Sequence, residues 1–456
     1  MPGPNVVFVF ADQWRAQATG YAGDPNVRTP NLDRLAAGSV NFVNAVSGCP
    51  VCSPYRASLL TGQYPLTHGI FVNDLYLSDR ATSLAQAFAR GGYNTAYIGK
   101  WHVDGHGRTS YIPPSRRQGF DFWRVLECTH EYNCSPYYAG DSDRMLTWDG
   151  YDAIDQTRCA IEYIRGCDRD KPFLLVLSWG PPHNPYQTAP DQFRAMYEAE
   201  KLRLRPNVRE GQWMPNLWGD VARIRNDLAG YYAHCSALDD CMGALLAALE
   251  QAGLADETIF VLTSDHGDML GSQGHWRKQH PYDESVRVPF LLRWPGGLGA
   301  QPRSLAAPID APDIMPTLLG LCGLEIPTTV EGQDFSPLLR GEAGAAEAGS
   351  AVLTCVAPFA EWLRALGAKE YRGLRTQRHT YVRDLQGPWL LFDNEADPYQ
   401  MTNLVASPEY IALRDDLDSL LAGKLRQRSD EFRPTEHYVE KWGCDPRRAG
   451  LKPWGE

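Results

Sequence analysis

The sequence predicts an α/β fold: a large, mostly parallel sheet sandwiched by helices, with a smaller C-terminal antiparallel sheet plus a helix. Short, fully apolar runs rich in β-branched and aromatic residues alternate with helical patterns through most of the chain. Apolar strands of this kind are typical of parallel sheets that are covered on both faces. Towards the C-terminus, short strands separated by turn residues replace that alternation.

The elements of the larger sheet follow one another in a regular order. Pro30 begins a helix after Thr29, and the pair Gly91-Gly92 ends another, as these residue types do at helix termini. The predicted strands are residues 6–10, 95–98, 173–178, 259–263 and 289–294, and the predicted helices are 30–35, 83–89, 148–165 and 221–249.

A change in composition marks a second unit. Residues 341–349 are rich in Gly, Ala and Glu, which is typical of a linker. Beyond it we expect strands at 371–376, 379–383 and 389–393, and a helix over 408–421. The sequence therefore predicts a larger domain over residues 1–345 and a smaller α+β domain over residues 350–456.

Composition excludes several classes of protein. The net charge of −11 disfavours a nucleic-acid-binding protein, which needs a basic face. No apolar run reaches the roughly 20 residues of a membrane span. The N-terminal residues have no basic region and no cleavage site of the kind found in signal peptides, so we expect a cytoplasmic protein whose eleven cysteines are mostly reduced and buried.

Titratable residues follow four of the predicted strands. Asp12-Gln13, Lys100 with His102, His183, and Asp265-His266 each come just after a strand. Because the carboxyl ends of parallel strands meet at one edge of a sheet, we expect these side chains to form a site there. Carboxylate and amide oxygens favour Ca²⁺, while an imidazole also admits Mn²⁺ or Zn²⁺.

The segment from Cys52 to Gly62 predicts a short helix, with Pro54 near its start and Gly62 at its end. Cys52 then lies at the positive end of the helix, where an anion is favoured, and Arg56 can direct its forked donors at the same anion. The alternative is a buried cysteine beside an ordinary helix.

The sequence Cys-x-Pro-x-Arg followed by Ala-Ser-Leu-Leu-Thr-Gly resembles the signature of the type I sulfatases, formylglycine-dependent enzymes of the alkaline phosphatase superfamily. Tyr55 departs from it, since Ser, Thr or Ala is usual there. The remaining matches keep the family's order and cover nearly the whole chain: Asp12-Gln13, Gly99-Lys100-Trp101-His102, Thr263-Ser264-Asp265-His266-Gly267-Asp268, and Leu391-Phe392-Asp393 to Asp397-Pro398.

This resemblance implies a larger, catalytic domain and two cofactors. A maturation enzyme would convert Cys52 to formylglycine. One divalent cation, most often Ca²⁺ in the family, would be held by Asp12, Gln13, Asp265, His266 and the group derived from Cys52. Many members carry Asp in place of Gln13 and Asn in place of His266, which leaves the metal's identity open.

The resemblance also implies roles for the basic residues. Lys100 and Lys278 would bind the sulfate oxygens, with Arg56 supporting the nucleophile. His183, as an imidazolium, would protonate the leaving alcohol, and His102 would assist breakdown of the enzyme-bound sulfate ester. Asn73 either reaches the substrate or caps a turn.

Three functions remain open on the sequence. The first is hydrolysis of an aryl, sugar or alkyl sulfate monoester. The second is hydrolysis of a phosphonate monoester or phosphodiester, which Gln13 and His266 keep open. The third is a non-catalytic binder of sulfate esters in which Cys52 is never converted. A homo-oligomer is compatible with the sequence, which does not indicate the natural substrate.

Overall fold

The computed structural model describes residues 3–208, 221–345, 349–360, 362–364 and 367–447. Within these residues the chain forms a mixed sheet of ten strands and a separate antiparallel sheet of four. In sheet order the larger one consists of β10 (Arg303–Leu305), β2 (Val40–Phe42), β9 (Leu291–Arg293), β8 (Thr258–Ser264), β1 (Asn5–Asp12), β7 (Phe173–Pro182), β3 (Asn94–Lys100), β4 (Phe122–Leu126), β5 (Pro136–Ala139) and β6 (Leu146–Thr147).

The middle of the large sheet is parallel, as predicted. Strands β8, β1, β7, β3 and β4 pair in parallel, whereas β9, β5 and β6 join antiparallel at the flanks. The strands predicted from apolar runs are all present. The flanking strands β2, β4, β5, β6 and β10 were not predicted, because they are short and only partly apolar.

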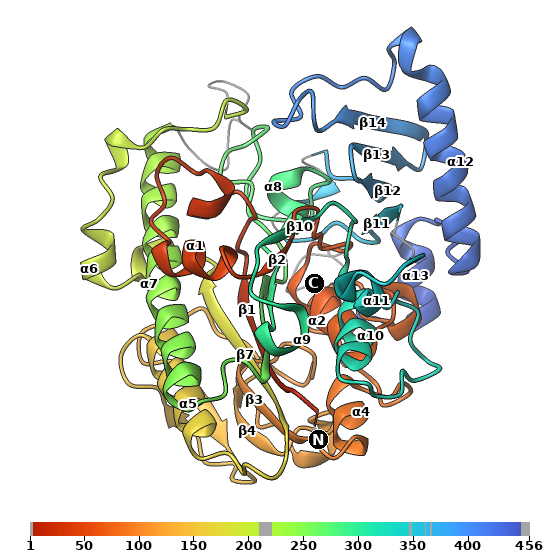
Figure 1. Ribbon diagram of the computed structural model, residues 1–456. Coiled ribbons are helices and arrows are strands. Elements are labelled where there is room, and N and C mark those ends of the chain that lie inside the picture. The colour runs from red at the N-terminus through yellow and green to blue at the C-terminus, as the bar shows by residue number, and fades with distance from the viewer. Residues whose placement is uncertain (1–2, 209–220, 346–348, 361, 365–366, 448–456) are drawn as a thin grey trace.

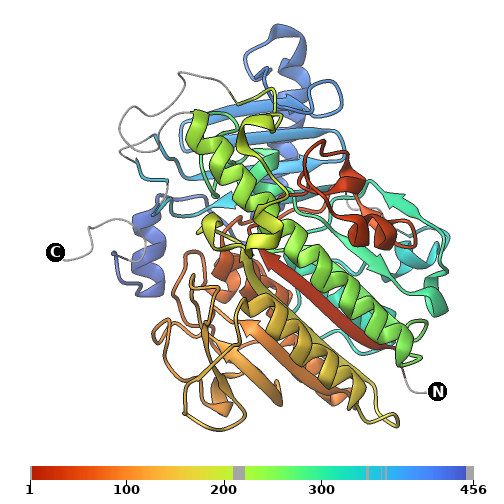
Figure 2. The ribbon, with the colours of Figure 1, turned by 90° about the vertical axis from the view of Figure 1, so that its left-hand side faces the viewer.

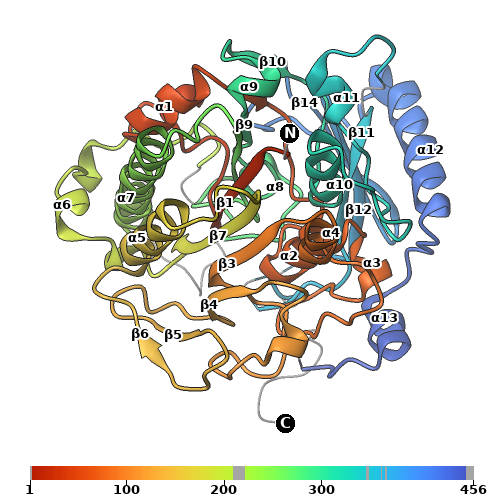
Figure 3. The ribbon, with the colours of Figure 1, turned by 60° about the horizontal axis from the view of Figure 1, so that its bottom comes forward.

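Helices cover both faces of this sheet. Alternate side chains of β1 point to opposite faces: Val7 and Val9 into one core, Phe8 and Phe10 into the other. Helices α1 (Pro30–Ala36), α5 (Asp152–Arg165) and α7 (Val221–Gln251) lie on the first face, and α2 (Cys52–Thr61), α4 (Leu84–Arg90) and α10 (Ala311–Leu321) on the second (Figure 3).

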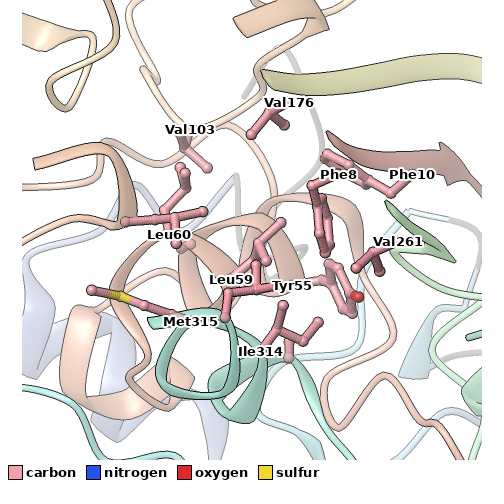
Figure 4. Packing of buried hydrophobic residues seen from close by; sticks show 14 of the residues in the cluster. Phe8, Phe10, Tyr55, Leu59, Leu60, Val103, Val176, Val261, Ile314 and Met315 are labelled. Atoms are coloured by element: carbon pink, nitrogen blue, oxygen red, sulfur yellow. The ribbon is translucent and has the colours of Figure 1, made fainter. Parts of the chain in front are cut away.

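Packing holds α2 firmly against the sheet. Every residue of this helix is buried. Its Leu59 and Leu60 lie beside Ile314 and Met315 of α10, while Tyr55 lies near Phe8 of β1 (Figure 4). Because a well-packed helix cannot slide, the position of its first residue, Cys52, is fixed relative to the strand ends.

The smaller sheet contains β11 (Ser350–Cys355), β12 (Tyr371–Thr376), β13 (His379–Asp384) and β14 (Gly387–Asp393), all antiparallel. Helix α12 (Ile411–Gln427) covers its outer face, and α13 (Thr435–Trp442) follows (Figure 1). Leu353, Tyr371 and Val382 on the inner face pack with Val46 and Val286 of the larger unit. The two units therefore share a core.

Most element boundaries differ from the expected ones by a few residues, and two helix boundaries illustrate this. The helix expected from residue 148 begins at Asp152, because Leu146–Thr147 pairs with β5 and Trp148 stacks on Tyr137. The helix expected to end at residue 421 runs on to Gln427. Of the expected linker 341–349, residues 346–348 lie outside those described. The remaining short helices are α3 (Pro65–His68), α6 (Asp191–Arg194), α8 (Asp283–Val286), α9 (Pro295–Leu298) and α11 (Ser336–Arg340).

The cysteines are free and most of them are buried, as expected. Among the described helices, none has both the length and the apolarity needed to cross a bilayer. Figure 2 shows β1, in red, ending in the middle of the molecule, between the small sheet above and the orange segments below. The carboxyl ends of the central strands meet at this place.

Candidate active site

Four neighbouring strands deliver the predicted side chains to one place. Asp12 and Lys100 are the last residues of β1 and β3, His183 follows β7, and Asp265-His266 follows β8. All of these side chains are buried. The order β8-β1-β7-β3 makes the four strand ends adjacent, so the expected site at this edge is formed.

Asp12, Cys52, Asp265 and His266 form a compact cluster of candidate metal ligands, each offering one atom within 4.8 Å of the others. Cys52 Sγ lies 3.2 Å from His266 Nε2 and 3.5 Å from Asp12 Oδ1. His266 Nδ1 lies 2.9 Å from the carbonyl oxygen of Gly267, which holds the proton on that nitrogen and leaves Nε2 facing the cluster.

The donors in this cluster suit a divalent cation. Burial and the charge of Asp12 raise the pKa of Asp265, because two carboxylates face each other in a buried site. A cation between the two carboxylates would remove the repulsion between them. Two carboxylates and an imidazole, with the amide oxygen of Gln13 nearby, are compatible with Ca²⁺, Mn²⁺ or Zn²⁺.

Arg56 binds the carboxylates of this cluster. Its Nη2 donates to Asp265 at 3.0 Å and lies 3.5 Å from Asp12. Its Nη1 donates to the carbonyl oxygen of Lys100 and the hydroxyl of Ser178. In the structure the guanidinium therefore compensates the carboxylates, and the expectation that its fork points at an anion on Cys52 stays a prediction.

Two lysines lie close to Cys52. Lys278 Nζ is 3.3 Å from Cys52 Sγ and 3.5 Å from Gln13 Oε1, and Lys100 pairs with Asp12. Burial and Asp12 raise the pKa of Cys52, but Lys100, Lys278 and His266 outweigh them, so that the pKa lies well below its usual value. The surroundings of Cys52 therefore favour negative charge.

The surroundings of His183 favour its neutral form. Lys278 Nζ donates to its Nε2 at 3.0 Å, and its Nδ1 lies 2.8 Å from the carbonyl oxygen of Asn184. Burial, Lys278 and His130 hold the pKa of His183 well below its usual value. This differs from the expected imidazolium. The ring of His130 stacks on His183 at a centroid distance of 4.4 Å.

His102 and Asn73 form hydrogen bonds with residues next to the cluster. His102 Nε2 lies 3.2 Å from Asp74 Oδ1, and Asp74 also pairs with Arg108. Asn73 Oδ1 accepts a hydrogen bond from the backbone N–H of Ser53, in the first turn of α2. For this oxygen the structure favours the capping alternative.

Several residues of the site carry no signal in the sequence. Ser178 lies within β7, and a lone serine in a strand is uninformative. His130, Asp74 and Tyr186 are far along the chain from the residues that they contact. Asp268 lies within the quoted motif, yet nothing in the sequence shows that it contacts Gln13.

Comparisons with known proteins agree with this geometry. The sulfatase family profile matches residues 4–324, and the profile of the N-sulphoglucosamine sulphohydrolase C-terminal region matches residues 271–427. An ulvan-active sulfatase of Formosa agariphila is 46% identical over 442 residues, covering 96% of this chain and 84% of the relative.

Solved structures are also similar. One, from a study of glycosaminoglycan metabolism in Bacteroides thetaiotaomicron, is 30% identical with a TM-score of 0.83, covering 96% of this chain and 99% of the other. The phosphonate monoester hydrolase of Agrobacterium radiobacter is 25% identical with a TM-score of 0.75, covering 93% and 96% respectively.

Proposed function

This chain belongs to the sulfatase family, and we propose that the sulfate ester it hydrolyses is carried by a sugar. The ulvan-active relative supports a saccharide substrate. The single observation that best supports a hydrolytic site is the buried cluster of Asp12, Cys52, Asp265 and His266, with the two lysine ammonium groups beside it.

Two cofactors are part of this proposal. We propose that a maturation enzyme converts Cys52 to formylglycine and that Asp12, Gln13, Asp265 and His266 hold Ca²⁺ beside it. When bound, the cation and the hydrated aldehyde together supply a hydroxyl nucleophile of lowered pKa. The low pKa of the Cys52 thiol supports this, because the same cationic surroundings would stabilise an oxyanion at that position.

The basic side chains stabilise the negative charge of the transferring sulfate group. Lys278 and Lys100 flank Cys52 and Asp12 in a buried site, where fixed charges act more strongly than in water. Arg56 contributes indirectly, because it neutralises Asp12 and Asp265 and so keeps the site from repelling an anionic substrate.

His183 is proposed to deliver the proton to the departing oxygen. Lys278 donates a hydrogen bond to Nε2, so its ammonium can supply the proton that this nitrogen passes to the departing oxygen. The Asn184 carbonyl and the stacked His130 fix the plane of the ring.

A substrate panel tests this function. Sulfated oligosaccharides, an aryl sulfate and a phenyl phosphonate monoester are compared by kcat/KM, with Cys52→Ala as the blank. We expect sulfate release from saccharides to exceed phosphonate hydrolysis by orders of magnitude. A preference for the phosphonate would favour the alternative, which the Agrobacterium radiobacter structure and the His266 position support. Tight sulfate-ester binding without turnover would favour the non-catalytic binder.

A further inference from the structure

Gln13 is held rigidly at its backbone. Its φ of 74° lies in the left-handed region, which non-glycine residues seldom adopt. Its N–H donates to Asp265 Oδ1 at 3.0 Å, and its carbonyl oxygen accepts a hydrogen bond from Tyr231 at 2.9 Å. Only the side chain of Gln13 can still change its orientation, so that either the oxygen or the NH₂ of its amide faces the cation site.

Asp268 determines that orientation. It lies three residues after Asp265 and is completely buried. Its Oδ2 accepts hydrogen bonds from Gln13 Nε2 at 2.7 Å and from the Tyr186 hydroxyl at 2.5 Å. Because Asp268 accepts from the side-chain nitrogen of Gln13, the NH₂ of the Gln13 amide is turned towards Asp268 and its oxygen away from it.

Backbone donors fix Asp268 in turn. Its Oδ1 accepts from the N–H groups of Leu270 at 3.1 Å and Arg277 at 3.0 Å. With the NH₂ of Gln13 committed to Asp268, Oε1 lies on the opposite side, 3.5 Å from Lys278 Nζ, which itself contacts Cys52. The oxygen therefore faces the cluster, as a cation ligand must.

We propose that Asp268 is a positioning residue of the cation site: its hydrogen bond holds the amide of Gln13 so that Gln13 presents an oxygen to the cation. This inference rests on the cation of the proposed function. Hydrogen bonds of this kind tune metal sites, and their loss typically lowers metal affinity about 10- to 100-fold.

The test is Asp268→Asn, which keeps size and shape. The Asn oxygen stays on the Leu270 and Arg277 donors, so its NH₂ meets the NH₂ of Gln13. The Gln13 amide then turns its own NH₂ to the cation. We expect Ca²⁺ affinity, measured by calorimetry or chelator competition, to fall about 10- to 100-fold.

A double-mutant cycle separates positioning from a purely structural role. Gln13→Glu alone places a second carboxylate against Asp268 and weakens binding. In the double variant Gln13→Glu/Asp268→Asn the Asn NH₂ donates to the new carboxylate, so we expect affinity to recover to within about threefold of the native protein. Tyr186→Phe is the control: it removes one donor to Asp268 and the longer, 3.4 Å contact of Gln13 Nε2 with the Tyr186 hydroxyl. The 2.7 Å hydrogen bond from Gln13 to Asp268 stays, so we expect affinity to change little.

Each outcome decides one claim. Asp268→Asn protein that is folded by circular dichroism and binds Ca²⁺ as tightly as the native protein overturns the inference. So does a double variant as weak as Asp268→Asn, since a structural defect is not rescued by Gln13→Glu. A native protein that binds neither Ca²⁺, Mn²⁺ nor Zn²⁺ overturns the proposed cation itself.

Discussion

Replacing His183 by Ala should change which leaving groups the enzyme can expel. General acid catalysis contributes about 10²- to 10⁴-fold, or about 2.7–5.4 kcal/mol of transition-state stabilisation. Lys278 donates a hydrogen bond to His183 Nε2 and also contacts Cys52. The imidazole therefore lies close to the proposed nucleophile, where the oxygen that leaves the sulfate group can receive a proton. A sugar alkoxide needs that proton, whereas an activated nitrophenolate does not.

The assay compares kcat/KM for a sulfated saccharide with that for a series of aryl sulfates of decreasing leaving-group acidity. For His183→Ala we expect a loss of about 10²- to 10⁴-fold on the saccharide and of less than about tenfold on nitrophenyl sulfate. The control His130→Phe keeps a flat ring against His183 and should preserve the native ratio of the two rates. Equal losses on every substrate would remove His183 from the acid role.

Three further predictions address the cluster and the fold. Cys52→Ala should lower turnover by several orders of magnitude with an unchanged circular dichroism spectrum, and an active variant would refute the assignment of the nucleophile. Chelation should remove activity and lower the Tm, because the folded protein loses the binding free energy of the cation. Ca²⁺ at about 100 times its Kd should restore about 2.7 kcal/mol, and unchanged stability would argue against a bound cation. Burial raises the pKa of Asp152 to about 7, against about 3.9 in the unfolded chain, so its neutral form favours folding at low pH and that contribution is lost between about pH 4 and 7. Relative to Asp152→Asn, the native protein should therefore lose about 2–3 kcal/mol of unfolding free energy between pH 5 and pH 8 in urea titrations, and parallel profiles would contradict this.

The sequence was sufficient to predict the central sheet and to place most residues of the cluster that we propose binds a cation. Asp12 and Asp265 could be found because buried parallel strands are apolar runs, and polar residues directly after such runs must meet at one edge. Cys52 could be placed because Pro54 and Gly62 bound its helix. These are local signals, readable within a few residues.

The sequence could not provide the contacts between distant segments. Tyr186 and Asp268, which form a hydrogen bond, are 82 residues apart in the sequence. Arg56 binds the carboxylates of Asp12 and Asp265, which come from the ends of two separate strands. The protonation of His183 also depends on Lys278, which only the fold brings near. The domain boundary, the cytoplasmic location and the oligomeric state remain predictions.

Mass spectrometry of the peptide containing Cys52, taken from preparations of known specific activity, tests the central claim most directly. Conversion of the thiol to an aldehyde lowers the peptide mass by roughly 18 Da. We expect the converted fraction to rise in proportion to the rate of sulfate release across preparations made with and without a maturation enzyme. Full activity in protein whose Cys52 remains an unmodified thiol would contradict the account.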